Sequence, residues 1–472
     1  MPSTDVCYMP ATEMAEAIRR KTLSPVEVVD AAFKRIHALN PILNAYCTLT
    51  EERARADARA AEAAVMRGDP LGPLRGVPVS IKDLVLTKGV RTMRGSKIYE
   101  HFVPDEDAPV VERLRQAGAI MLGKTTTPEF GFKGMTDSPV TGITRNPWNP
   151  TRTPGGSSGG AGVAVATGMG PLAVGSDGGG SIRIPSSFCG IFGMKASFGR
   201  VPAYPPSAVA LLSHTGPMTR TVRDAALMLN VMVGPDDRDI HSLPRDGTDY
   251  LAACDGNLRG LRVAWSATLG YAPVEPEVAR VAEAAARVFA SDLGCRLDAA
   301  DPGFENPASI FNVLWVGGLG TYLQPYLAEW RSRLDPDLAT MIDGLPRLTA
   351  ADYAGALMQK SLVWDKARTF FERYDVLLTP TMPTVAWEAG QPAPARIAGR
   401  SIADFDYTPF TFPFNLTGQP AATVPCGFSS DGLPIGLQIV GRRLDDATVL
   451  RVCAAFEAAR PWTGKRPALT AV

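Results

Sequence analysis

Two glycine- and serine-rich loops that flank a small-residue segment constrain this chain more than any other feature. The stretch from Gly155 to Pro185 reads GGSSGGAGVAVATGMGPLAVGSDGGGSIRIP. Glycine adopts positive φ and lets backbone approach a ligand closely, so such loops can turn several N–H groups toward one shared space. Clustered N–H groups stabilise an oxyanion, and a serine beside them is a candidate nucleophile. The two candidate serines are Ser157 and Ser181.

The composition indicates a globular protein that carries no net charge. Lys plus Arg and Asp plus Glu both number 48 among the 472 residues, so no net field attracts nucleic acid or an acidic membrane surface. The seven cysteines are scattered and no two have Cys-x-x-Cys spacing, which argues against disulfides and a zinc site and favours a reducing compartment. Because no signal-peptide pattern and no long apolar run is present, we expect a cytoplasmic protein without membrane spans.

The first third of the chain alternates between helical and strand periodicity. A capped helix begins at Ser24 and is expected to end at Pro41, and a second helix covers 51–68. The 77–82 segment alternates apolar with other residues, which predicts a strand that ends at Lys82 and directs this side chain away from the valines. A helix from Asp107 and a strand at 119–122 follow. This order is typical of an α/β layer architecture.

The remaining elements fit one large domain over 1–472. We expect an N-terminal helical segment to about residue 70, a core over about 71–235, a variable helical region over about 300–375 and C-terminal strands and a helix over about 376–465. A Gly- and Pro-rich loop is predicted to run to about Pro217, and another covers about 384–408.

A serine hydroxyl needs a base before it can act as a nucleophile at neutral pH. Among the four histidines only His214 is a candidate, and nothing resembling a Ser-His-Asp arrangement surrounds it. A lysine that burial keeps neutral can serve instead, and Lys82 at the end of an apolar strand is the better candidate. The purely structural alternative for Lys82 is a salt bridge to a carboxylate such as Asp83.

Two further patterns invite functional interpretations that the sequence disfavours. Residues 118–125 fit the P-loop string G-x-x-x-x-G-K-[ST], but an apolar strand lies between the two glycines and Pro128 follows without a helix start. Cys189 lies in SSFCGIF, where a buried, unreactive thiol is the simpler interpretation.

The glycine-serine stretch resembles the amidase signature family of serine hydrolases. The match includes GGSSGG at 155–160 and DGGGSIRIP at 177–185, and nearly the whole chain is covered. Other matching segments are GVPVSIKD around Lys82, GKTTTPEFG at 123–131, NPWNP at 146–150, FCGIFGMK at 188–195 and GLPIGLQIVG at 432–441. The resemblance implies a single large α/β/α sandwich with a mixed central sheet, and neither a metal nor an organic cofactor.

The family's catalytic residues map onto this sequence one by one. The resemblance implies that Ser181 is the nucleophile, that Ser157 follows a cis peptide bond and relays protons, and that Lys82 is the general base. It implies an oxyanion hole formed by the N–H groups of Gly178, Gly179, Gly180 and Ser181, and backbone contact between Gly131 and substrate. Ser158 is expected to support the network, while Asp177 and Arg183 brace the loop.

The substrate pocket is less well defined by the sequence. We expect Phe130, Phe132 and the 306–345 region to form it, although core packing is the favoured role for Trp315, Tyr322 and Trp330 within that region.

The implied function is hydrolysis of a carboxamide to an acid plus ammonia or an amine, through an acyl-Ser181 intermediate. Linear amides are the expected substrates, and cyclic amides and a homodimer are left open. The alternative is the glutamine-hydrolysing component of a tRNA-dependent amidotransferase, known as its A subunit. Such proteins usually carry Thr-Asp-Thr-Gly-Gly-Ser, whereas Ser-Asp-Gly-Gly-Gly-Ser at 176–181 favours a free-standing amidase. A catalytically inactive binding protein is disfavoured because both serines and Lys82 are present.

Overall fold

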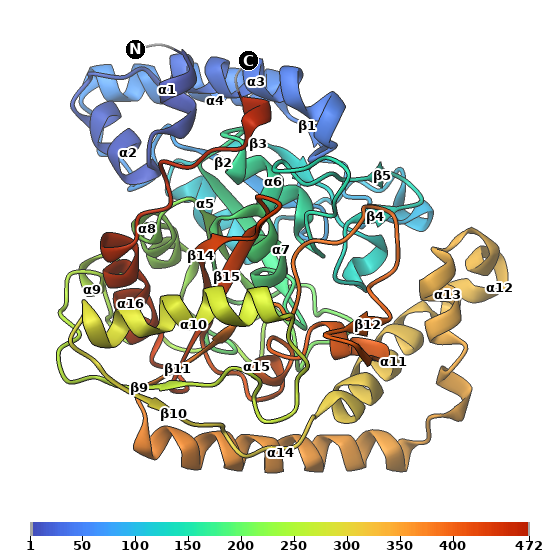
Figure 1. Cartoon of the computed structure of the whole chain (residues 1–472). Helices are drawn as coiled ribbons and strands as arrows, with labels where there is room; N and C mark the ends of the chain where they lie inside the picture. Colours follow the sequence, from blue (N-terminus) through green and yellow to red (C-terminus); the bar gives the residue numbers. More distant parts are fainter. Residues whose placement is uncertain (1–2, 471–472) are drawn as a thin grey trace.

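The computed structural model describes residues 3–470, which fold around one mixed eleven-stranded sheet (Figure 1). The strand order is β1 (Tyr46–Leu49), β3 (Ile120–Thr125), β2 (Pro78–Lys82), β6 (Leu172–Asp177), β8 (His214–Thr219), β7 (Phe192–Lys195), β14 (Ala421–Phe428), β15 (Pro434–Gly441), β11 (Val376–Pro380), β9 (Arg262–Trp265) and β10 (Arg296–Ala299). Strands β3, β2 and β6 run parallel, as do β11, β9 and β10, and the remaining pairs are antiparallel. The predicted α/β architecture with a mixed sheet is confirmed.

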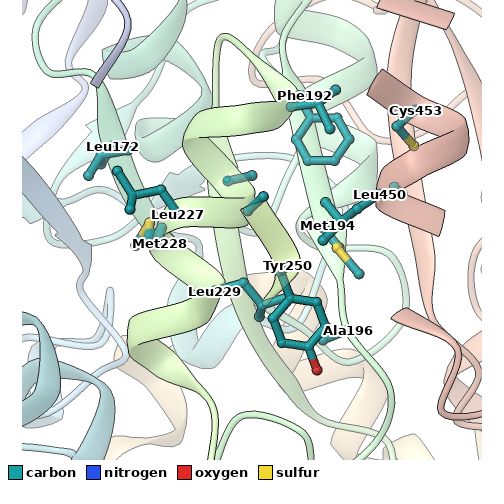
Figure 2. Packing of buried hydrophobic residues seen from close by; sticks show 14 of the residues in the cluster. Leu172, Phe192, Met194, Ala196, Leu227, Met228, Leu229, Tyr250, Leu450 and Cys453 are labelled. Atoms are coloured by element: carbon teal, nitrogen blue, oxygen red, sulfur yellow. The ribbon is translucent and has the colours of Figure 1, made fainter. Parts of the chain in front are cut away.

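Helices cover both faces of this sheet. One face packs against α2 (Ala11–Arg19), α5 (Pro109–Gln116), α8 (Val222–Met232), α9 (Tyr250–Ala253), α10 (Pro276–Ser291) and α16 (Asp446–Ala459). Figure 2 shows part of this core, where side chains of α8, β7 and α16 meet. The other face packs against α3 (Pro25–Leu43), α4 (Glu51–Arg67), α6 (Gly159–Ala166) and α7 (Arg183–Cys189).

A peripheral group of helices borders the site. Helix α11 (Ala308–Leu323) packs against α14 (Ala350–Arg373), and α13 (Pro336–Ile342) contacts α11 from the other side (Figure 1). The remaining α-helices of the described residues are α1 (Ser3–Tyr8), α12 (Leu327–Trp330) and α15 (Pro413–Leu416). The remaining strands form two small hairpins, β4 (Asp137–Ser138) with β5 (Gly142–Ile143) and β12 (Arg396–Ile397) with β13 (Arg400–Ser401).

Helix α3 begins where the sequence predicts but ends later than predicted. The predicted capping box is present, since Ser24 and Glu27 exchange side-chain and backbone contacts at its start. The predicted end at Pro41 is wrong, because the helix continues to Leu43 and ends at Asn44 in the left-handed conformation (φ 52°). Proline removes only one N–H donor, and this close to the end the helix tolerates that loss.

The segment assigned to a loop up to Pro217 contains the central strand β8. It pairs with β6 on one side and β7 on the other, so tertiary pairing overrides its unfavourable Gly216-Pro217 composition. A side chain at Gly216 would place its Cβ 2.2 Å from the Met194 carbonyl oxygen, so close strand contact requires glycine there.

The cysteines and the helix lengths bear on two further expectations from the sequence. All seven cysteines are free thiols, as expected. Among the described residues, no helix combines the length and the apolar character needed to cross a bilayer.

Candidate active site

Lys82 lies at the carboxyl end of β2 and is completely buried. Its Nζ donates to Ser157 Oγ at 2.7 Å and to Ser176 Oγ at 3.0 Å. The alternative salt bridge to Asp83 is wrong, because that carboxylate lies 3.7 Å from Lys124 Nζ instead. Lys82 is therefore held among hydroxyls rather than paired with a carboxylate.

The surroundings of Lys82 favour its neutral form. Burial lowers the pKa of this amine to about 7, although the negative charge of Asp177 acts in the opposite direction. A substantial fraction of the amine is consequently unprotonated near pH 7 and can accept a proton from the hydroxyl beside it.

The loop before α6 positions Ser157. The Gly156–Ser157 peptide bond is cis, as the resemblance implies. A Cβ at Gly156 would lie 2.4 Å from the Met135 carbonyl oxygen, so only glycine fits there. Ser158 connects this loop to the second one, because its N–H donates to the Ser181 carbonyl oxygen at 3.1 Å and its hydroxyl to the Ser176 carbonyl oxygen at 3.1 Å.

Ser181 follows the tight turn between β6 and α7, and its side chain is almost buried. Beneath the turn, the Asp177 carboxylate accepts from the N–H groups of Gly180 (2.7 Å) and Ile182 (3.2 Å) and from the Arg183 guanidinium. Burial alone would raise the pKa of Asp177, but the charge and hydrogen bonds of Arg183 hold this pKa below its usual range. Asp177 and Arg183 thus brace the loop.

The backbone donors around Ser181 are not all available to an oxyanion. The Gly180 N–H already donates to Asp177 Oδ1, so one of the four N–H groups expected to bind an oxyanion is not available. The N–H groups of Gly178, Gly179 and Ser181 have no acceptor among the described residues. A Cβ at Gly178 would lie 2.8 Å from Trp315 and one at Gly179 would lie 2.7 Å from Phe311, so α11 packs directly onto this loop.

Comparison with known proteins agrees with this geometry. A model of the Amidase family matches residues 27–450. The chain belongs to the amidase signature family. It is 42% identical over 475 residues to an acylamidase of Rhodococcus erythropolis, with 99% of each chain covered. It is also 38% identical over 495 residues to the A subunit of the glutamyl-tRNA(Gln) amidotransferase of Moorella thermoacetica, with 98% of this chain and 99% of that one covered.

Solved structures of the family superimpose closely. A bacterial aryl acylamidase matches with a TM-score of 0.91 and 32% identity, with 97% of both chains covered. A 6-aminohexanoate cyclic dimer hydrolase complexed with substrate matches with a TM-score of 0.89 and 31% identity, with 98% of this chain and 99% of that one covered. The chain is therefore an amidase-family hydrolase with the family's α/β fold.

Two cavities flank the paired loops of this amidase-family chain. The first, here called the Ser181 cavity, contains the nucleophile candidate and has a largely aromatic wall; it is lined by Gly131, Phe132, Lys133, Gly134, Gly179, Ser181, Ile184, Phe311, Trp315, Phe405, Tyr407 and Thr408. The second, the Ser176 cavity, is lined by Ser176 together with Phe130, Arg94, Trp315 and Tyr322. Phe130 and Phe132 thus face different cavities, and Trp315 borders both.

Sequence reasoning missed several residues of this candidate site. Ser176 contacts Lys82 across two neighbouring strands, and its only signal was its place just before Asp177. Thr411 and Asn415 lie far along the chain, yet Thr411 Oγ1 donates to the Gly179 carbonyl oxygen (2.7 Å) and Asn415 Nδ2 to the Asp177 carboxylate (2.9 Å). No spacing pattern connects these two residues to the glycine loop.

The alternative catalytic residues lie elsewhere. His214 is buried on β8, where burial holds its pKa well below the ordinary value and its Nδ1 lies 2.9 Å from the Leu212 carbonyl oxygen. Its described contacts include neither candidate serine. Burial raises the pKa of the Cys189 thiol, which makes it unreactive. The P-loop string coincides with β3, and its Lys124 donates to the Val85 carbonyl oxygen, which fits a structural role.

Proposed function

We propose that this chain is a free-standing amidase that hydrolyses the C–N bond of a carboxamide through an acyl-Ser181 intermediate. The products are a carboxylic acid and ammonia or an amine. One observation carries the proposal: the fully buried amine of Lys82, with its pKa lowered to about 7, lies 2.7 Å from the hydroxyl of Ser157. A neutral amine hydrogen-bonded to a serine is a base with a proton relay, which is what the proposed nucleophile Ser181 needs.

The acylation step uses both serines. Lys82 accepts the proton of Ser157 while Ser157 accepts the proton of Ser181. The Ser181 oxygen attacks the amide carbonyl carbon, and the C=O electron pair moves to the oxygen. The N–H groups of Gly178, Gly179 and Ser181 stabilise this oxyanion, each contributing about 3–4 kcal/mol if it behaves like other such donors.

Collapse of the tetrahedral intermediate then needs a proton on the leaving nitrogen. The proton passes from Lys82 through Ser157 to this nitrogen, the C–N bond breaks and the amine departs. Water then loses a proton to the pair of Ser157 and Lys82 and attacks the acyl-Ser181 ester. The acid is released when the Ser181 oxygen leaves and takes a proton back from this pair. The protein's groups end each cycle in their starting protonation states.

Intact-protein mass spectrometry tests this assignment. A rapid quench after mixing with phenylacetamide should show a phenylacetyl adduct that maps to the peptide containing Ser181. The Ser181→Ala variant should show none and should release no ammonia above background. An adduct on another residue, or steady hydrolysis by the variant, would contradict the proposed nucleophile.

Glutamine hydrolysis within a tRNA-dependent amidotransferase is the second candidate function, because the Moorella thermoacetica relative is 38% identical over almost the whole chain. The acylamidase at 42% identity and the Ser-Asp-Gly-Gly-Gly-Ser sequence favour free-standing hydrolysis. Ammonia and amine release from a panel of linear and cyclic amides by the purified chain, with glutamine included, separates the two. Turnover of amides without partners supports the first, and activity on glutamine alone supports the second.

A further inference from the structure

The Ser176 cavity has a chemical character that the proposed reaction alone does not explain. It lies beside the catalytic residues, since the Ser176 hydroxyl that lines it is 3.0 Å from Lys82 Nζ. None of the residues that line it, all within the described part of the chain, is acidic, and Arg94 is the one permanent cation among them. The cavity is therefore positively charged next to the reaction centre.

Arg94 is held in place without a carboxylate. Its backbone is left-handed (φ 54°) and is fixed by hydrogen bonds with the backbone of Asp83 and Phe130. Its Nη1 donates to the Tyr322 hydroxyl at 2.6 Å, and its guanidinium lies 4.8 Å from the centre of the Tyr99 ring. No carboxylate in the described part of the chain lies within ion-pair distance of this guanidinium, and its Nε is buried without an acceptor.

Trp315 supplies a second donor without an acceptor. This residue is only 5% exposed, and its indole Nε1 has no hydrogen-bond partner among the described residues. Stacking on Phe311 at 5.2 Å and an edge contact with Phe405 at 5.9 Å fix the ring where it borders both cavities. Buried N–H groups are seldom left unpaired, because each one forfeits its hydrogen bond to water.

We propose that the Ser176 cavity binds a carboxylate carried by the amine part of the substrate, with Arg94 and Trp315 as hydrogen-bond donors. This inference rests on the proposed amidase function. A guanidinium that keeps free donors and lacks an acidic partner matches the charge and the planar geometry of a carboxylate. A ligand carboxylate would also provide the acceptors that the two buried N–H groups lack.

The position of the cavity assigns it to the leaving amine. In the proposed reaction Ser157 protonates the leaving nitrogen, and the Lys82 amine bridges Ser157 and Ser176. The Ser176 cavity reaches this hydrogen-bonded group through Ser176, so we place the leaving group on the side of Ser176. The Ser181 cavity, with Gly179 and the aromatic wall of Phe132 and Phe311, then takes an apolar acyl group. The resulting substrate class is N-acyl amino acids with an apolar acyl part.

Matched substrates test this assignment through kcat/KM. We would compare N-phenylacetyl-4-aminobutyrate with its neutral counterpart N-phenylacetyl-butylamine, and with N-butyl succinamate, which carries the carboxylate on the acyl side. Wild-type protein should prefer the first. R94M should lower kcat/KM for the carboxylate substrate roughly tenfold more than it lowers kcat/KM for the neutral one. W315F keeps an aromatic ring and should lower kcat/KM for the carboxylate substrate severalfold more than for the neutral one. R91M removes a nearby exposed arginine and should leave the ratio of the two unchanged.

Each outcome decides the proposal. If circular dichroism shows that R94M is not folded, R94K and W315F can be used to measure the same ratio of kcat/KM values for the two substrates. Equal losses for both substrates in these variants, or a preference for N-butyl succinamate, would overturn it. If no amide is hydrolysed, the proposed function fails, and calorimetric titration with 4-aminobutyrate decides separately. Weaker binding by R94M than by wild type supports the carboxylate site, and absent or equal binding contradicts it.

Discussion

Arg183 and Asp177 form an ion pair that is completely buried beneath the loop that carries Ser181, with 2.9 Å between Nη2 and Oδ1. Arg183 also reaches Gln438 Oε1 (2.8 Å) and Asn415 Oδ1 (2.6 Å), so the pair joins the loop to two segments from the last part of the chain. The turn that carries Ser181 is therefore held by a charged network rather than by glycine flexibility alone.

Removing one partner of this pair should be costly. In Arg183→Met the Asp177 carboxylate stays buried without its main compensating charge. We therefore expect the free energy of unfolding to fall by about 3–5 kcal/mol. Urea denaturation followed by circular dichroism measures this change. Arg223→Met, which breaks the exposed pair with Asp255, serves as the control and should change stability little. Equal stability of R183M and wild type would show that the pair is not required.

Activity should depend on pH through Lys82. The reaction needs the neutral amine, and the pKa of Lys82 is about 7, so kcat/KM should rise with pH through about 7 and level off above about 8. Protonation of the amine below pH 7 removes the base. Initial rates with a neutral amide between about pH 5.5 and 9 provide the profile. A profile that is flat across pH 7 would argue against this lysine as the base.

Ser157, the proposed proton relay, should be as necessary for activity as Ser181, the proposed nucleophile. Ser157→Ala leaves Lys82 without its hydroxyl neighbour, so we expect kcat to fall by about a thousandfold or more, comparable to Ser181→Ala, because residues that act as one unit fail together. The exposed Ser291→Ala serves as a matched control and should keep wild-type rates. A modest loss in S157A would mean that the proton reaches Lys82 by another route.

The glycines of the loop before Ser181 should not tolerate a methyl group. In Gly179→Ala the new Cβ would lie 2.7 Å from the Phe311 ring, which must move and shift α11 and the wall of the Ser181 cavity. We expect kcat/KM and thermal stability to fall together. Gly355→Ala in α14 is the contrasting control, since nothing lies within 4 Å of its Cβ, and there we expect a gain of about 0.5–1 kcal/mol. Unchanged activity in G179A would show that this wall adapts.

The elements whose signals are local were predicted well. The capping box at Ser24 and Glu27 and the end of the second helix at residue 68 depend on neighbours within one helical turn, and both appear in the structure. The strand β8 was missed, because its stability comes from β6 and β7 on either side rather than from its own glycine and proline. The place of Phe130 on one cavity and Phe132 on the other could not be deduced either, since the left-handed backbone at Phe130 turns the chain between them.

Motifs and periodicity over a few residues were enough to establish the family, the alternation of helices and strands, and the candidate residues Lys82, Ser157 and Ser181. The side chains that surround these three became known only from the folded chain. Ser176 reaches Lys82 because β2 and β6 are neighbours in the sheet, and Asn415 reaches Asp177 from a distant segment of the sequence. Strand order and long-range packing set such contacts, and no local pattern encodes either of them.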